Sequence, residues 1–513
     1  MTFLRKNVWE SGGDWGDPVL WYARGVKALK ARALKDRTSW KFFGAIHGFD
    51  PQLWEQVGYL AQNEPPPSNA DANAYWQQCQ HGSWYFLPWH RGYLMALEAV
   101  LRDVIVKANG PKDWALPYWN YFKPSENLLP PAFASKDWPD GTGDNPLYVE
   151  QRYGPDWPNG SKVYVPLDQV NLDALNDQDF VGPGAGANPG FGGVNTGFEH
   201  SGGTHGGVES QPHDLVHVFV GGGDQNTIGL MAWPDLAGLD PIFYLHHANI
   251  DRLWEVWKKV PGSKGDPTQP KWVKGPASIG EHAFEMPKPD GGKWTYTPGD
   301  MGDLSKLDYT YDDLSPPSVT PELVARLRGL GASVPTVESV QRRPAMPPPA
   351  TELLGATESV PLVGGGASAA LALNPTVKAK VAASLNAVRT EAPGQAAEPD
   401  RVYLNLENVR GLDDATVFDV YVNVPPGQDP AQHPELKAGS VALFGVRKAS
   451  ASNDAHAGNG LNFVLNISSI VDALHMSSAL NASELHVQLV PRRPVPEAAQ
   501  ISIGRISAYR RGE

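Results

Sequence analysis

The sequence predicts a mainly α-helical domain with long loops, followed by a small antiparallel β-sandwich C-terminal domain. Residues 1–310 hold long segments in which apolar side chains recur with a helical period. Residues 396–513 instead hold short β-prone runs at regular spacing. Residues 311–395, between these two regions, are rich in proline, glycine and alanine, and we predict a linker there.

The helical prediction is strongest in three segments of the first domain. They read DPVLWYARGVKALKARA from residue 17, RGYLMALEAVLRDVIVKA from residue 91 and HHANIDRLWEVWKKV from residue 246. In the third segment, Ile250, Leu253 and Trp257 fall on one helical face, which predicts a buried stripe. Stretches rich in glycine and proline separate the segments, such as DFVGPGAGANPGFGGVNTG from residue 179, and they predict loops.

The strand prediction covers the last part of the chain. Runs such as VFDVYVNV from residue 417, LNFVLNI from residue 461 and ELHVQLVP from residue 484 are short, β-prone and evenly spaced. Before them, the alanine-rich run from residue 364 to residue 388 predicts a helix between the two domains.

The amino-acid composition argues against some classes of binding partner. The 513 residues carry a net charge of −13, which argues against nucleic acid and anionic membrane surfaces. The N-terminal residues contain no continuous apolar segment of a signal peptide, and no apolar run reaches the ~18 residues of a membrane span. We therefore expect a cytoplasmic protein. A single cysteine, Cys79, excludes an internal disulfide framework.

Histidines form the most informative pattern. His213 and His217 are four residues apart, which places both imidazoles on one face of a helix. His81 and His90 are separated by Pro88, which ends any shared helix and lets the two rings converge from different segments. Further candidates are His47, in the apolar run FFGAIHGF, and the adjacent pair His246 and His247.

Neutral imidazole suits copper, zinc, iron and nickel, so the histidines alone leave the metal open. Two groups of three would leave positions free on each metal for a small ligand. We expect ordinary hydrogen-bonded or surface roles for the remaining histidines, which are His200, His205, His282, His433, His456, His475 and His486.

Two of these segments resemble a known family. HGSWYFLPWHRGYLMALE, from His81, and DPIFYLHHANID, from Asp240, are similar to the two signature segments of the tyrosinase family of type 3 copper proteins. That family includes catechol oxidases and molluscan haemocyanins, and the resemblance extends over about residues 20 to 260. It implies a four-helix-bundle copper domain holding two copper ions.

The resemblance also implies a ligand set. It assigns one copper ion to His47, His81 and His90, and the other to His213, His217 and His247. His247 takes the ligand place because Asp251 lies four residues beyond it, which leaves His246 as a neighbour. Asp251 is our candidate for a carboxylate that fixes the tautomer of His247.

In fungal and molluscan relatives, a cysteine two residues before the second histidine forms a thioether with it. The triplet CQH fits this pattern, and we expect a Cys79–His81 crosslink. A crosslink would hold the imidazole in one orientation while copper changes oxidation state. The alternative is a small buried free thiol.

The implied reaction uses O2 to hydroxylate monophenols in the ortho position and to oxidise o-diphenols to o-quinones. Glu209, four residues before His213, matches a glutamate that orders a basic water in relatives, and Asp214 is the second candidate for accepting the phenol proton. Pro234 stands where plant catechol oxidases carry a bulky phenylalanine over the second copper, and Val218 is also modest in size. These two residues favour a tyrosinase over a pure catechol oxidase.

Other readings remain. A catechol oxidase or an o-aminophenol oxidase would lack the hydroxylation step, and a haemocyanin-like oxygen carrier would use the same histidines. A dinuclear zinc hydrolase usually carries bridging carboxylate ligands, and none is placed with these histidines. The family also suggests a role in pigment (melanin) formation, and a homo-oligomer is possible.

The C-terminal runs resemble a second known module. VFDVYVNV is similar to a run in the C-terminal domain of plant polyphenol oxidases. In those relatives the domain packs over the copper entrance and keeps the enzyme latent. We therefore expect residues 396–513 to form a shielding lid.

Overall fold

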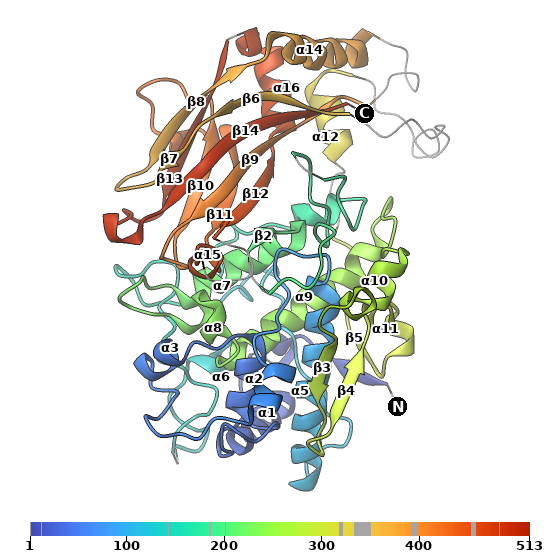
Figure 1. The fold of residues 1–513 in the computed structure, drawn as a ribbon, viewed down its shortest axis with the longest axis vertical. Coiled ribbons are helices and arrows are strands. Elements are labelled where there is room, and N and C mark those ends of the chain that lie inside the picture. Colours follow the sequence, from blue (N-terminus) through green and yellow to red (C-terminus); the bar gives the residue numbers. More distant parts are fainter. Residues whose placement is uncertain are drawn as a thin grey trace.

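The computed structural model describes residues 2–11, 13–141, 143–184, 186–200, 202–317, 322–332, 350–390, 398–452, 458–481 and 483–512. Within them the chain forms a helical unit and a second unit built on a large sheet, which lies above the helical unit in Figure 1. His456 falls outside the described residues. No helix of the described residues is both long and apolar enough to span a lipid bilayer.

The helical unit contains the predicted long helices together with many short ones. Its helices are η1 (Val8–Ser11), α1 (Asp17–Lys30), α2 (Trp40–His47), α3 (Pro51–Gln56), α4 (Asn69–Tyr75), α5 (Phe86–Lys107), α6 (Pro131–Ala134), η2 (Asp173–Asn176), η3 (Glu209–Asp214), α7 (Leu215–Gly221), η4 (Leu230–Ala232), α8 (Pro234–Ala237), α9 (Pro241–Lys259), α10 (Pro270–Lys274), η5 (Pro276–Ile279), α11 (Pro298–Met301) and η6 (Leu304–Lys306). Its strands are β1 (Phe3–Arg5), β2 (Gly203–Thr204), β3 (Phe284–Pro287), β4 (Lys293–Tyr296) and β5 (Tyr309–Tyr311).

Local sequence explains where the main helices begin. The Ser39 side chain accepts a hydrogen bond from the Phe42 amide and caps α2. Asp240 caps α9 in the same way, and Pro241 occupies the first turn, where no amide donor is needed. Pro88 likewise lies in the first turn of α5, so His81 remains in the preceding loop, as the sequence predicted.

The second unit contains a ten-stranded sheet. Its elements are α12 (Glu322–Gly329), β6 (Thr351–Thr357), β7 (Val360–Pro361), β8 (Ala367–Leu373), α14 (Pro375–Thr390), β9 (Arg401–Arg410), β10 (Val417–Val422), η7 (Pro430–Gln432), η8 (Pro434–Leu436), β11 (Lys437–Ala442), α15 (Val446–Ala449), β12 (Leu461–Asn466), α16 (Ser468–Met476), η9 (Ala479–Asn481), β13 (Glu484–Pro491), η10 (Glu497–Ala499) and β14 (Ser502–Arg511). The strand order is β11-β10-β13-β8-β6-β14-β9-β12-β2, with β7 pairing β14.

This sheet corrects the predicted sandwich. All ten strands belong to one curled sheet rather than to two packed sheets. The sheet is mixed because β2 pairs with β12 in parallel, while the other pairings are antiparallel. Leu485, Val487 and Leu489 of β13 are buried at every second position, and α14 and α16 contribute to the same apolar core.

The boundary of the second unit also differs from the predicted one. Residues 351–390, which the sequence analysis assigned to a linker, supply β6, β7, β8 and α14. The alanine-rich run 367–373 is a strand because both of its edges pair, with β13 on one side and β6 on the other. Tertiary pairing therefore overrides the helical preference of alanine.

Strand pairing, apolar packing and ion pairs connect the two units in addition to the covalent chain. The strand β2, from the helical unit, extends the large sheet through β12. Phe444 precedes α15, which lies at the junction of the two units in Figure 1, and it packs into the core of the helical unit. Next to it, Arg447 and Lys448 each form an ion pair with Asp235, both at 2.9 Å.

Candidate metal centre

The six predicted ligands converge on one buried place. His47 ends α2, His90 lies in α5, and His247 lies in α9. The other three positions are in the loop before α5, in η3 and in α7; they are His81, His213 and His217. All six side chains are buried, with at most 5 % of any residue exposed.

The rings of the two predicted groups lie next to one another. In the first group (His47, His81 and His90), ring centroids lie 5.4–5.7 Å apart. In the second group (His213, His217 and His247), they lie 4.5–5.4 Å apart. The His90 and His247 rings stack across the two groups at 4.5 Å, so the two groups are in direct contact.

Hydrogen bonds orient these rings from behind. His47 Nδ1 bonds the Pro234 carbonyl at 2.9 Å, and His90 Nδ1 bonds the Phe86 carbonyl at 2.8 Å. His217 Nδ1 bonds the Met231 carbonyl at 2.8 Å. A carbonyl accepts only from N–H, so each bond places the proton on Nδ1 and leaves the Nε2 lone pair pointing inward.

The inward nitrogens lack other partners. The Nε2 atoms of His47, His81, His90 and His213 are buried without a hydrogen bond. The remaining two, on His217 and His247, face each other at 3.2 Å. Burial lowers the pKa of His47 to about 4 and lowers the pKa of the other five well below the usual value of an imidazole. Neutral imidazoles with unpaired lone pairs fit copper ions.

His246 lies close to the second group and is the alternative ligand. Its ring centroid is 4.9 Å from that of His217, and its Nε2 is also buried without a partner. Its Nδ1 faces the Tyr121 hydroxyl at 3.3 Å. Among the described residues, possible ligand atoms of His47, His90 and His247 lie within 4.8 Å of one another, whereas His246 is this close only to histidines of the second group. His247 therefore lies between the two metal positions.

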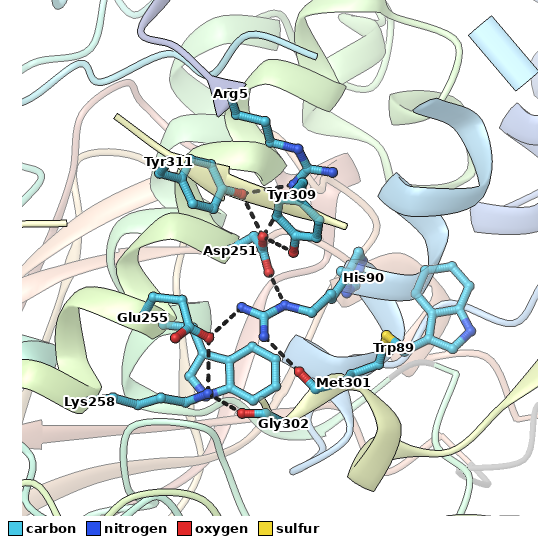
Figure 2. Close-up of polar contacts among 12 residues, drawn as sticks. Arg5, Trp89, His90, Asp251, Glu255, Lys258, Met301, Gly302, Tyr309 and Tyr311 are labelled. Carbon is cyan, nitrogen blue, oxygen red and sulfur yellow. Dashed lines mark hydrogen bonds and ion pairs between the residues drawn. The ribbon is translucent and has the colours of Figure 1, made fainter. Parts of the chain in front are cut away.

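Asp251 does not contact His247, contrary to our expectation. Its carboxylate instead accepts hydrogen bonds from Arg91 at 2.5 Å, from Arg5 at 3.3 Å and from two tyrosines at 2.5 and 2.7 Å, and Figure 2 shows it facing Arg5, Tyr309 and Tyr311. His247 Nδ1 is left without a partner.

Asp251 therefore stabilises the packing of the elements around the site and does not orient a ligand. Arg91 also pairs with Glu255 of α9 at 2.8 Å, and Arg5 pairs with Glu98 of α5 at 2.5 Å. These buried charges tie the two helices that carry His90 and His247 to the N-terminal strand β1. Arg91 and Arg5 hold the pKa of Asp251 below its usual value although burial alone would raise it.

The two candidate acids have different neighbours: Asp214 contacts His213 of the second group, whereas Glu209 contacts the chain beside His81 of the first group. The Glu209 carboxylate accepts two hydrogen bonds from the Gly82 amide at 2.9 and 3.1 Å, and Gly82 follows His81. Asp214 accepts from His213 Nδ1 at 2.9 Å. Both acids are buried, which raises the pKa of Glu209 to about 7 and also raises the pKa of Asp214.

His205, for which we expected an ordinary role, contacts both candidate acids. His205 Nδ1 bonds Asp214 at 2.7 Å, and its Nε2 is 4.0 Å from Glu209. Burial alone would lower the pKa of His205, but the carboxylates of Glu209 and Asp214 raise it to about 9. No spacing pattern identifies this residue, because it reaches the site from the loop after β2.

Cys79 has two imidazole neighbours. Its Sγ is 3.3 Å from His81 Nδ1, a non-covalent contact that brings the two residues of the expected crosslink together, and also 3.3 Å from His200 Nδ1. His200 Nε2 in turn contacts Lys448 of the second unit at 2.8 Å. We had expected only an ordinary hydrogen-bonded or surface role for His200, but it links Cys79 to the second unit.

Two of the three residues considered for substrate access line a pocket beside the first histidine group. Pro234 lies against His47 of the first group, through its carbonyl, rather than over the second metal position as we expected. Val218 is buried in α7, directly after His217. Phe444 of the second unit stacks on the His217 ring at 4.3 Å and also meets His81 and His213. Pro234 and Phe444 line one enclosed pocket with His47 and His81.

Comparisons with known proteins agree with this geometry. Residues 37–260 match the model of the common central domain of tyrosinase, and residues 350–511 match a domain of unknown function. The chain is 32% identical to tyrosinase HcTyr1 from Hahella sp. (strain CCB-MM4) over 520 residues, which covers 98% of each chain.

Plant proteins are also similar. Chloroplastic polyphenol oxidase A1 from Vicia faba is 30% identical over 51% of this chain and 45% of its own length. The match to the plant relatives thus spans less than half of their length. Among solved structures, latent apple tyrosinase superposes with a TM-score of 0.59 at 21% identity, over 100% of this chain and 97% of the other.

Proposed function

The chain belongs to the tyrosinase family, whose enzymes use two copper ions to oxidise phenols, and we propose that it acts as a tyrosinase in the strict sense. It would hydroxylate monophenols in the ortho position and oxidise o-diphenols to o-quinones with O2. One observation carries this proposal: the buried carboxylate of Asp214 bonds His213 of the second histidine group, and the buried carboxylate of Glu209 bonds the Gly82 amide beside His81 of the first group.

In this proposal the first histidine group holds one copper ion and the second group holds the other. The copper pair supplies the oxidation of the phenol by O2. The chain supplies the geometry: backbone carbonyls fix three of the rings, and the stacked His90 and His247 bring the two groups together.

Hydroxylation needs a phenol that has lost its proton, and the two acids provide acceptors for it. Glu209 is fixed by the Gly82 amide, and Asp214 is fixed by two imidazoles. The role of these acids distinguishes a tyrosinase from a catechol oxidase, because an o-diphenol is oxidised without the hydroxylation step.

We further propose that the second unit is a lid and that Phe444 is its plug. The phenyl ring occupies the place over His217 that a substrate ring would need. The ion pairs of Arg447 and Lys448 with Asp235 hold the plug in position. The name of the apple protein describes a latent enzyme, which supports the same state here.

Oxygen uptake tests the proposal. Phe444→Ala removes the plug and should raise the rate with catechol, and the same variant should consume O2 with tyramine after a lag. Glu209→Gln, added to Phe444→Ala, should lower the tyramine rate by about 10²-fold or more and the catechol rate much less. Uptake with catechol alone in Phe444→Ala would instead identify a catechol oxidase.

A further inference from the structure

Asp214 is shared between two imidazoles. One carboxylate oxygen accepts from His213 Nδ1 at 2.9 Å, and the other accepts from His205 Nδ1 at 2.7 Å. His213 is the only member of the second group whose Nδ1 bonds a side chain among the described residues. Its orientation therefore depends on how the Asp214 carboxylate is held.

His205 is placed by the second unit. It directly follows β2, whose residues Gly203 and Thr204 pair with Leu461 and Asn462 of β12. The His205 ring also contacts the Phe463 ring at a centroid distance of 5.8 Å, and His205 is only 2 % exposed. Strand pairing and ring contact thus fix this imidazole from the sheet side.

We propose that His205 is a positioning residue for the second copper site and that the C-terminal sheet fixes the position of the His205 ring. Strand β12 holds β2 and the His205 ring, His205 Nδ1 holds Asp214, and Asp214 holds the ring of the ligand His213. The second unit then helps to build the metal site as well as to cover it. This inference requires copper at the second group of histidines and is independent of the hydroxylation of monophenols.

Two amide substitutions separate the nitrogens of His205. Asparagine places an N–H donor where Nδ1 stands, so His205→Asn keeps the bond to Asp214. Glutamine places its amide where Nε2 stands, towards Glu209, so His205→Gln loses that bond. We expect His205→Gln and His205→Ala to weaken copper binding at the second site by about 10- to 100-fold, and His205→Asn to restore it to near the native affinity.

The measurement is copper affinity of the full-length apoprotein, by competition with a chromophoric Cu(I) chelator, together with kcat and KM for catechol. The thermal midpoint of each apoprotein shows that the variants fold, and the exposed His486→Asn serves as a matched control. Native copper affinity in His205→Gln would overturn the proposal. So would equal losses in His205→Asn and His205→Gln, because these would indicate packing rather than the Nδ1 bond.

A second experiment tests the part played by the sheet. Phe463→Leu loosens the contact with His205 and should weaken copper binding about as much as His205→Ala. In the double variant Phe463→Leu/His205→Ala the two losses should not add, because they act through one path. Fully additive losses would contradict the coupling. A failure of tyramine hydroxylation would leave these copper affinities unchanged and would count against the proposed function alone.

Discussion

The two groups of histidines are held in different ways. In the first group, two rings are fixed by carbonyls of the backbone and the third lies beside the Cys79 thiol. In the second group, one ring is fixed by a carbonyl, one by the Asp214 carboxylate, and His247 Nδ1 has no partner. Backbone carbonyls thus fix two rings of the first group, whereas one ring of the second group depends on a carboxylate side chain, Asp214, which His205 also holds.

This difference suggests that the second copper site is the adjustable one. Carbonyls of helices and turns move only with the backbone, but a carboxylate shared by two imidazoles changes when either partner changes. The plug Phe444 also stacks on a ring of the second group. We therefore expect the C-terminal unit to influence the activity mainly through the second copper site.

Removing a ligand should have the largest effect. We expect His247→Ala to lose one of the two copper ions and to show no oxidation of catechol above background, since only this ring gathers with both groups. His246→Ala removes an equally buried imidazole next to it and should keep both ions. Metal analysis of the purified variants checks this prediction, and the reverse result would exchange the two assignments.

The buried charges behind the site should matter next, for stability. Asp251→Ala leaves the buried guanidinium groups of Arg5 and Arg91 without this partner, which should cost about 3–5 kcal/mol of unfolding free energy. Chemical denaturation of the full chain measures the loss. A change below about 1 kcal/mol would show that the network does not clamp α5 to α9.

The same carboxylate predicts a pH dependence. The folded pKa of Asp251 lies below its value in the unfolded chain, so its contribution is complete above the unfolded pKa of about 3.9 and is lost as pH falls below it. Stability measured between pH 6 and pH 3 should therefore fall more steeply in the native chain than in Asp251→Ala. Parallel curves would contradict this assignment.

Weakening the lid should have a smaller effect. Lys448→Met keeps the length of the side chain but removes the ion pair with Asp235, and it should raise the catechol rate by a few-fold as open states become more populated. Lys380→Met, which removes an ion pair with Glu352 inside the second unit, should leave the rate unchanged and is the matched control. A rise of equal size in both variants would indicate a general loosening of the sheet.

The crosslink should have the smallest effect on rate and the clearest chemical signature. If Cys79 and His81 form a thioether after copper loading in air, their peptide will be lighter by two hydrogen atoms and will resist thiol alkylation. Peptide mass spectrometry detects both changes. A freely alkylated peptide from the active, copper-loaded protein would show that Cys79 remains a thiol and that its two imidazole contacts are only packing.

The sequence was most informative where one motif carries both structure and chemistry. The spacing of His213 and His217 and the position of Pro88 predict the convergence of the rings, because helix geometry fixes them locally. Phe444 and His205 could not be predicted in this way, since their roles arise from pairing and packing between distant segments. The helix predicted in the run 364–388 is present in its second half as α14, whereas residues 367–373 form a strand for the same reason: neighbouring strands pair with both edges.

The central claim is that six imidazoles hold two copper ions close enough to act together on one O2 molecule. Electron paramagnetic resonance of the fully copper-loaded protein, combined with metal analysis of the same sample, tests it most directly. We predict two copper ions per chain and almost no resonance signal, because two neighbouring Cu(II) ions couple their spins. Two ions with the full signal of isolated Cu(II), or a single bound ion, would contradict the account.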